Sequence, residues 1–122
     1  MQHFANLNVW KRSHALVLDL YRLSAGFPAD ERFGLTSQIR RAAASVPTNI
    51  AEGSKRKSQR DYAHFLNLAE ASLAETDYLI LLSRDLTYLT TDQAEPLQQE
   101  VSEISRMLYA LREKVDGPTS AS

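Results

Sequence analysis

Hydrophobic residues recur along this chain with the 3.6-residue period of an α-helix, and no segment shows the two-residue alternation of a β-strand. Four segments carry the helical pattern, over about 9–25, 35–52, 58–86 and 92–115. Short links between helices of similar length favour antiparallel neighbours. We therefore predict an all-α, antiparallel, up-down-up-down four-helix bundle that forms one domain over residues 1–122, with an ordered core over about 7–115 and a disordered tail at 116–122.

Residues at the segment boundaries indicate where the helices begin and end. Asn8 is the expected N-cap of the first helix, and a glycine and a proline shortly after residue 25 form a typical stop. Ser58, followed three residues later by Asp61, matches a capping pattern at the start of the third helix. Pro96 is compatible with a fourth helix that begins near residue 92, provided that it falls in the first turn.

One proline lies inside a predicted helix. Pro47 lacks the N–H that would bond to the carbonyl of Ala43, so it interrupts the hydrogen-bond ladder of the second helix. The apolar spacing nevertheless continues across it, through Ile39, Val46 and Ile50. We therefore expect one kinked helix rather than two helices.

The first and third helices each carry two apolar stripes. In the first helix the stripes are Leu7, Trp10, His14, Val17 and Tyr21, and beside them Leu16, Leu20 and Leu23. In the third they are Tyr62, Phe65, Ala69, Leu73, Thr76 and Ile80, and beside them Leu68, Leu79, Leu82 and Leu86. A wide buried face explains such pairs, but we favour a second stripe that meets another subunit. The fourth helix has a single seam, expected in the core: Leu97, Val101, Ile104, Leu108, Leu111 and Val115.

The composition limits the class of protein. With 122 residues, 43% of them hydrophobic and 24% charged, the chain has the make-up of a single globular domain. It has no cysteine, which excludes disulfides, thiolate metal sites and cysteine nucleophiles. No signal-peptide pattern opens the sequence, and no window is apolar enough for a membrane helix. We expect a soluble, cytoplasmic protein without a membrane partner.

No catalytic pattern stands out. A di-iron site in a bundle core needs two carboxylate-x-x-His motifs and two further glutamates, but only Asp61 and His64 have that spacing. His14 lies on an apolar stripe and is expected to be a hydrogen-bonded core residue. The sequence has no nucleophile elbow or phosphate-binding glycine loop, and Arg60 and His64 stand too close together for the Arg–His pair of the HEPN ribonucleases. We therefore expect no catalytic residue, no metal, no cofactor and no enzymatic activity.

Positive charge is concentrated in the middle of the chain. Between residues 40 and 60 a single acid, Glu52, accompanies six cations: Arg40, Arg41, Lys55, Arg56, Lys57 and Arg60. Because this segment closes the second helix and opens the third, we expect the six cations to form one patch at one end of the bundle. Phosphate backbones attract such patches. A solvated interhelix turn is the alternative, since the sequence pI is only about 6.3.

Residues 38–53, with the sequence QIRRAAASVPTNIAEG, form the most distinctive segment of the chain. Supporting matches are Val9-Trp10-Lys11, Phe27-Pro28, Glu31, Gly34-Leu35, Phe65-Leu66, Ala69, Ser72-Leu73 and Glu75. Together they resemble the four-helix bundle proteins associated with intervening sequences of bacterial large-subunit (23S) rRNA genes, over about residues 7–115. Ala71 departs from the family pattern, which has glycine there, and this departure concerns local helix packing.

The resemblance implies a homo-oligomeric ring of five subunits. A related branch, the accessory proteins of diversity-generating retroelements, is a basic ring that binds nucleic acid and a reverse transcriptase. The resemblance also implies structural roles for the motif residues Arg41, Pro47, Asn49, Glu52, Gly53 and Glu75. In addition, Asn49 and Glu52 lie close enough to Pro47 along the helix to supply polar partners near it, and we expect Arg41 to pair across helices with Glu75.

These observations predict a non-enzymatic, ring-forming scaffold or adaptor. Its candidate ligand is RNA or DNA, bound through the basic patch at the junction of the second and third helices. The alternative is a purely protein-binding oligomeric bundle with no nucleic-acid ligand.

Overall fold

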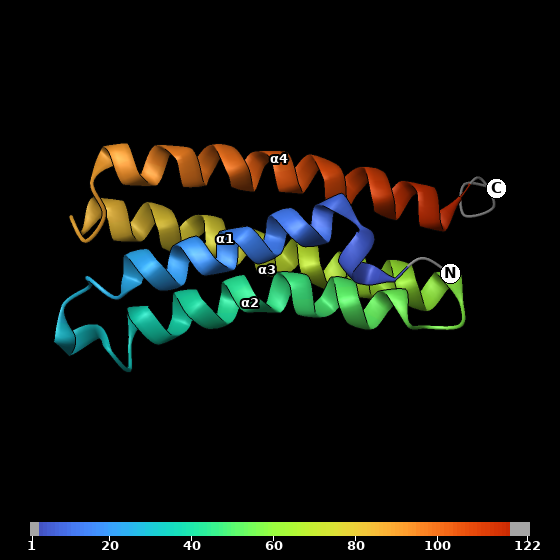
Figure 1. The fold of residues 1–122 in the computed structure, drawn as a ribbon, viewed down its shortest axis with the longest axis horizontal. Coiled ribbons are helices and arrows are strands. Elements are labelled where there is room, and N and C mark those ends of the chain that lie inside the picture. Colours follow the sequence, from blue (N-terminus) through green and yellow to red (C-terminus); the bar gives the residue numbers. More distant parts are fainter. Residues whose placement is uncertain (1–2, 118–122) are drawn as a thin grey trace.

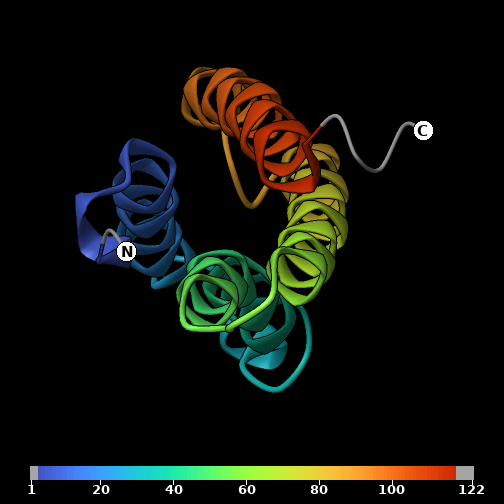
Figure 2. The same cartoon turned by 90° about the vertical axis from the view of Figure 1, so that its right-hand side faces the viewer.

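The structure, a computed structural model, describes residues 3–117. Its helices are α1 (Asn8–Ser24), α2 (Leu35–Ser54), α3 (Gln59–Asp85) and α4 (Thr91–Asp116), and the 3₁₀ turns η1 (Phe4–Asn6) and η2 (Ala29–Glu31) precede α1 and α2. Successive helices run in opposite directions (Figure 1). Seen end-on, they occupy four corners in chain order, so that α1 is diagonal to α3 (Figure 2). The predicted all-α antiparallel bundle is confirmed, and residues 3–117 contain no β-strand.

The chain ends differ from the expectation of a tail that starts at residue 116. Asp116 is the last residue of α4, and Gly117 is its C-cap. Residues 118–122, where most of the predicted disorder falls, lie outside the described residues.

The predicted start of α3 is confirmed, and that of α1 is wrong by one residue. The Ser58 hydroxyl accepts a hydrogen bond from the backbone N–H of Asp61, at 3.0 Å. Asn8, the expected N-cap of α1, is instead its first helical residue, and the N-cap is Leu7, which offers no side-chain hydrogen bond. The 3₁₀ turn η1 leads directly into α1, because its C-cap, Leu7, is also the N-cap of α1.

The start of α4 has a stronger signal than the one read from the sequence. Thr90 and Gln93 form a reciprocal capping box, in which each side chain accepts a hydrogen bond from the other residue's backbone N–H. Pro96 is therefore the sixth residue of α4 and lies in its second turn, not its first. The carbonyl of Asp92 loses its usual partner, but both residues are exposed, so water can bond to it.

Pro47 lies inside a single helix, as predicted, because α2 continues from Leu35 to Ser54. Its missing N–H leaves the carbonyl of Ala43 without the usual backbone donor. The next two side chains in the sequence bond back to the helix. The Thr48 hydroxyl donates to the carbonyl of Ala44 at 2.8 Å, and the Asn49 amide donates to the carbonyl of Ser45 at 2.8 Å. Neither bond goes to the carbonyl of Ala43, so Asn49 makes a polar contact near the proline but does not replace the hydrogen bond that Pro47 removes.

All four helices contribute to one hydrophobic core. The α4 seam is confirmed: Leu97, Val101, Ile104 and Leu108 are buried, and Leu111 and Val115 pack against the core while partly exposed. The second stripes of α1 and α3 belong largely to the same core, because Leu16, Leu20 and Leu79 are buried. These three residues do not form the separate surface that we expected to meet another subunit.

The buried face of α1 differs from the predicted one because it contains a serine. Val9, Ser13, Leu16 and Leu20 face the core, and the Ser13 hydroxyl donates to the carbonyl of Val9 at 2.7 Å, which satisfies its polar group inside the helix. His14 is consequently exposed and not a core residue. An apolar pattern alone does not detect a buried face that includes a self-satisfied serine.

Helices α2 and α3 approach closely along a line of small residues. A Cβ built on Gly53 would lie 2.8 Å from Cβ of Phe65 and 3.0 Å from Cδ1 of Tyr62, so only glycine fits there. Farther along the same interface the hydroxyls of Ser45 and Ser72 lie 2.8 Å apart and form a hydrogen bond across the two helices.

At the other end of the bundle, the two remaining links are tied together. The Tyr88 hydroxyl donates to the Glu31 carboxylate at 2.8 Å, and the rings of Tyr88 and Phe27 lie 5.5 Å apart. The backbone N–H of Leu35 and the Tyr88 hydroxyl both donate to Glu31 and hold the pKa of this carboxyl below its usual range. Thr87, which precedes Tyr88, adopts a left-handed backbone conformation with φ of 66°.

We predict that Leu108→Ala lowers the free energy of unfolding by about 2–5 kcal/mol, because the side chain is fully buried at mid-seam. Leu68→Ala, at a leucine that is 38% exposed, is the matched control and costs less than about 1.5 kcal/mol. Chemical denaturation measures both. Equal losses for the two variants would contradict the assigned core.

We predict that Gly53→Ala destabilises the fold by about 1–3 kcal/mol, because the new methyl group clashes with the start of α3. Gly26→Ala is the control, since the nearest atom to its Cβ is the carbonyl oxygen of Leu23 at an ordinary 3.6 Å. The control variant is expected to be neutral or slightly stabilising. A Gly53 variant as stable as the control, measured by thermal melting, would refute the close approach.

Candidate nucleic-acid interface

Four of the six predicted cations lie together at the turn between α2 and α3. This turn cluster consists of Lys55, Arg56, Lys57 and Arg60, and all four residues are exposed. Backbone hydrogen bonds from Lys55 to Glu52 and from Arg56 to Gly53 shape the turn. The Arg56 guanidinium lies 4.5 Å from the centre of the Phe65 ring, a cation–π contact that holds it over the start of α3.

The turn cluster has no acidic partner within residues 3–117. The ion pairs found there use other arginines, namely Arg12, Arg22, Arg84, Arg106 and Arg112. Arg112, near the end of α4, is paired with Glu70 and lies close to Asp116. The positive charge of the turn cluster therefore remains available to a ligand.

Arg40 is not part of this cluster, which corrects the prediction of one six-cation patch. Its guanidinium donates to the Ser24 hydroxyl at 2.8 Å and to the Tyr21 carbonyl at 3.1 Å, and it lies 4.6 Å from the centre of the Tyr21 ring. Arg40 thus caps the C-terminal end of α1, where unpaired carbonyls favour a cation. It stands roughly 20 Å along α2 from Lys55, because each helical residue adds about 1.5 Å.

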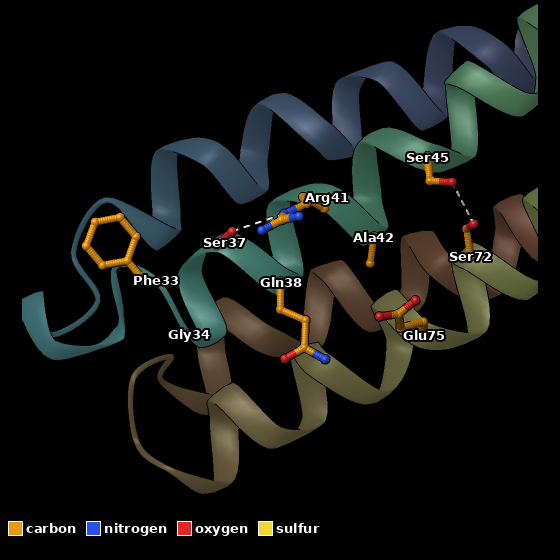
Figure 3. A pocket seen from close by; sticks show the side chains of 9 residues that line it. All are labelled: Phe33, Gly34, Ser37, Gln38, Arg41, Ala42, Ser45, Ser72 and Glu75. Carbon is orange, nitrogen blue, oxygen red and sulfur yellow. Dashed lines mark hydrogen bonds between the residues drawn. The ribbon is translucent and has the colours of Figure 1, made fainter.

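Arg41 also lies away from the turn cluster, and the predicted pair with Glu75 is not formed. Its Nε donates to the Ser37 hydroxyl at 3.1 Å, one turn earlier on α2. Figure 3 shows the Arg41 side chain directed along α2 toward Ser37, with Glu75 on α3 across a groove. This groove, about 490 Å³ in volume, also borders Phe33 and the hydrogen-bonded Ser45–Ser72 pair.

The remaining motif residues divide into packing and exposed positions. Pro47 and Gly53 are buried at helix contacts, and Asn49 bonds to Ser45. The Glu52 side chain is exposed and makes no hydrogen bond or ion pair within the described residues, so it does not supply the partner that we expected near Pro47. Ala71, the departure from the family pattern, is exposed on α3.

An ion pair at the protein surface joins α1 to α4. Arg12 of α1 donates to Glu100 of α4 at 2.6 and 2.9 Å and lies 3.8 Å from Glu103. The hydrogen bonds from Arg12 hold the pKa of Glu100 below its usual range. The acids of α4 are thus partly neutralised within the chain.

A second groove lies beside the turn cluster, and the sequence reasoning missed it. It has a volume of about 410 Å³ and runs between α1 and α2. Its walls are Phe4, Trp10, His14 and Val17 on one side and Ala44, Pro47, Thr48, Ala51 and Glu52 on the other. The position of Phe4 depends on the 3₁₀ turn η1, which is too short to be predicted from the spacing of apolar residues.

Residues 3–117 also lack two features that would point to another kind of function. No group of three or more histidines, aspartates or glutamates is placed to hold a metal ion in this part of the chain. None of its helices is both long and apolar enough to cross a membrane.

Comparisons with known proteins agree with the fold. A crystal structure of a protein of unknown function from the S23 ribosomal protein family of Bacteroides thetaiotaomicron VPI-5482 is similar, with a TM-score of 0.76 and 26% sequence identity. The match covers 86% of this chain and 98% of that chain. No protein of curated function matches. The sequence pattern of the 23S rRNA-intervening sequence proteins matches residues 5–110, and the chain therefore belongs to that family.

Proposed function

We propose that this chain is a non-enzymatic, self-assembling adaptor that binds RNA or DNA through the turn cluster. The observation that carries the proposal is the grouping of four exposed cations, Lys55, Arg56, Lys57 and Arg60, with no acidic partner among the described residues. Phosphate groups bind such clusters because each contact releases condensed counterions into solution. The non-enzymatic part rests on the sequence, whose histidines and acids match no catalytic spacing.

The placement of the other arginines supports the turn cluster as the ligand-binding site. Most other arginines are engaged with acids or, like Arg40, with a helix end. Binding at the turn cluster therefore requires no internal ion pair to break. In a ring, copies of the turn at one rim would add their fields and offer several sites to one strand.

Self-assembly is supported by an apolar strip that α3 leaves exposed. Ala71, Ala74, Tyr78 and Leu81 follow one another at helical spacing, and all four are exposed. On the diagonally opposite helix, α1 exposes Leu18 (Figure 2). A contact between two different faces on opposite sides of the bundle is head-to-tail, and such a contact can close a ring. The family resemblance implies five members.

A purely protein-binding ring is the second candidate, favoured by the exposure of one aromatic side chain. Phe33 is 88% exposed at the rim of the groove that Arg41 and Glu75 border (Figure 3). Aromatic residues beside charged groups are common in protein interfaces. This groove lies at the end of the bundle opposite the turn cluster, so the two candidates use separate surfaces.

We predict that replacing Lys55, Arg56, Lys57 and Arg60 with glutamine leaves folding intact, because all four are exposed, and removes nucleic-acid binding at ~50 mM salt. The control variant replaces Arg22, Arg32, Arg84 and Arg106 with glutamine, which removes the same charge elsewhere. We expect the control to keep most of its binding and its salt dependence. Failure of the unmodified protein to retain any nucleic acid at ~50 mM salt would refute the proposal.

We predict a mass of five times the 13.7 kDa chain in light scattering at micromolar concentration. Tyr78→Lys should lower this mass, because it places a charge in the apolar strip, and Tyr109→Lys on α4 is the control. Each contact should bury at least about 1,000 Å² in total. A monomer would contradict self-assembly, and a dimer would contradict the ring alone.

A further inference from the structure

The groove between α1 and α2 is lined on one side by three aromatic rings. The Phe4 ring meets the Trp10 ring edge-on, with centroids 5.0 Å apart and planes at 63°. The His14 ring stacks on the Trp10 ring, since their centroids lie 5.1 Å apart and their planes differ by only 12°. An exposed histidine stacked on a tryptophan extends the aromatic surface into solvent.

The opposite wall is short and mostly apolar. Pro47, Thr48 and Ala51 of α2 form it, and the carboxylate of Glu52 stands at its end without a hydrogen-bond or ion-pair partner among the described residues. The volume of about 410 Å³ falls in the range of about 300–1,000 Å³ typical of small-molecule sites. The groove therefore has room for a planar ring system.

The turn cluster continues directly from this wall. Lys55 follows Ala51 by four residues and Glu52 by three, a spacing that puts it on the same face of α2. It stands about 6 Å farther along the helix than Ala51. The beginning of α1 and the end of α2 lie at the same end of the bundle (Figure 1), so the groove and the turn cluster lie at that end as well.

We propose, on the basis of the function proposed above, that the ligand is a single-stranded nucleic acid, with one unstacked base in this groove and its phosphates on the turn cluster. Aromatic rings beside cations are the common design of single-strand sites, because every base has a face that stacks. A duplex does not fit this arrangement, since its bases are already stacked on one another. The ligand is thus distinguished by strandedness rather than by sequence.

Glu52 has a specific part in this arrangement. Its negative charge repels phosphate from the groove and leaves the backbone to Lys55 and its neighbours. A carboxylate also accepts hydrogen bonds from the amino groups of bases such as cytosine. A cationic peptide could place a lysine between the rings and Glu52, but the four cations of the turn would repel it.

The chain contains one tryptophan, so Trp10 fluorescence reports on the groove directly. The full chain is titrated at ~50 mM salt with a mixed-sequence single-stranded oligonucleotide of about 12 residues, its duplex, and an abasic strand of the same length. We expect the single strand to quench Trp10 and to bind about tenfold more tightly than the abasic strand. The duplex and the abasic strand should bind through charge alone, without quenching.

Variants separate the groove from the turn. His14→Ala and Phe4→Ala should reduce the preference for the single strand about three- to tenfold and leave binding of the abasic strand unchanged. Tyr109→Ala, which removes an exposed ring on α4, is the control and should change neither.

Three results would overturn the inference. Equal affinity for all three ligands without quenching would remove the groove from the site and leave the charge-based function standing. Quenching by an oligolysine peptide, with none by the oligonucleotide, would identify a peptide site instead. No retention of any nucleic acid would remove both the groove inference and the proposed function.

Discussion

The close packing of α2 against α3 is the contact on which the rest of the structure depends. Gly53 lets the backbone of α2 reach the Phe65 and Tyr62 side chains, and the Ser45–Ser72 hydrogen bond joins the same two helices farther along. Because the helices meet at Gly53, the chain has only a short turn in which to reverse direction. Lys55 to Lys57 must therefore stand exposed at the tip, and Arg56 folds back over Phe65. The exposure of these cations is thus a consequence of helix packing.

Charged residues that are clustered in the sequence have separate roles in the folded protein. Arg40 belongs to a positive stretch of sequence, but it serves as the cap of α1. Glu100 belongs to an acidic stretch, but Arg12 neutralises it across the α1–α4 seam. Among the cations without an ion pair in the described residues, four are held together by the turn, namely Lys55, Arg56, Lys57 and Arg60. A nearly neutral chain can in this way present a local cluster of positive charge, so the net charge says little about its partners.

Much of the fold follows from the sequence because helical periodicity is a local signal. The α4 seam and the Ser58 cap follow from the sequence, since both depend on residues within a few positions of one another. The buried face of α1 does not follow from the sequence. Ser13 is a polar residue at a core position, and its hydroxyl donates a hydrogen bond to the carbonyl of Val9 in the same helix. The sequence predicts Arg40 in the basic patch, but its hydrogen-bond partners are on α1, and contacts between distant segments cannot be predicted from sequence spacing.

The aromatic groove illustrates a further limit of sequence patterns. Trp10 and His14 share the spacing of a core stripe. Trp10 is partly buried against the core, but its ring also meets Phe4 edge-on, and His14 is exposed with its ring stacked on Trp10. The turn η1 that brings Phe4 there has three residues, too few to show any period. The four cations of the turn cluster could therefore be predicted from the sequence, but the grouping of the Phe4, Trp10 and His14 rings could not.

The even number of helices returns the chain to the end from which it starts. The first turn of α1 and the last turn of α4 lie at the same end of the bundle as the α2–α3 turn (Figure 1). A domain fused to either terminus would thus be delivered beside the turn cluster, while the opposite end would stay clear. For a sensor or a tethering reagent built on this scaffold, cargo at either terminus would share the space of the ligand, and a distant attachment point would have to be made in the link between α1 and α2 or between α3 and α4.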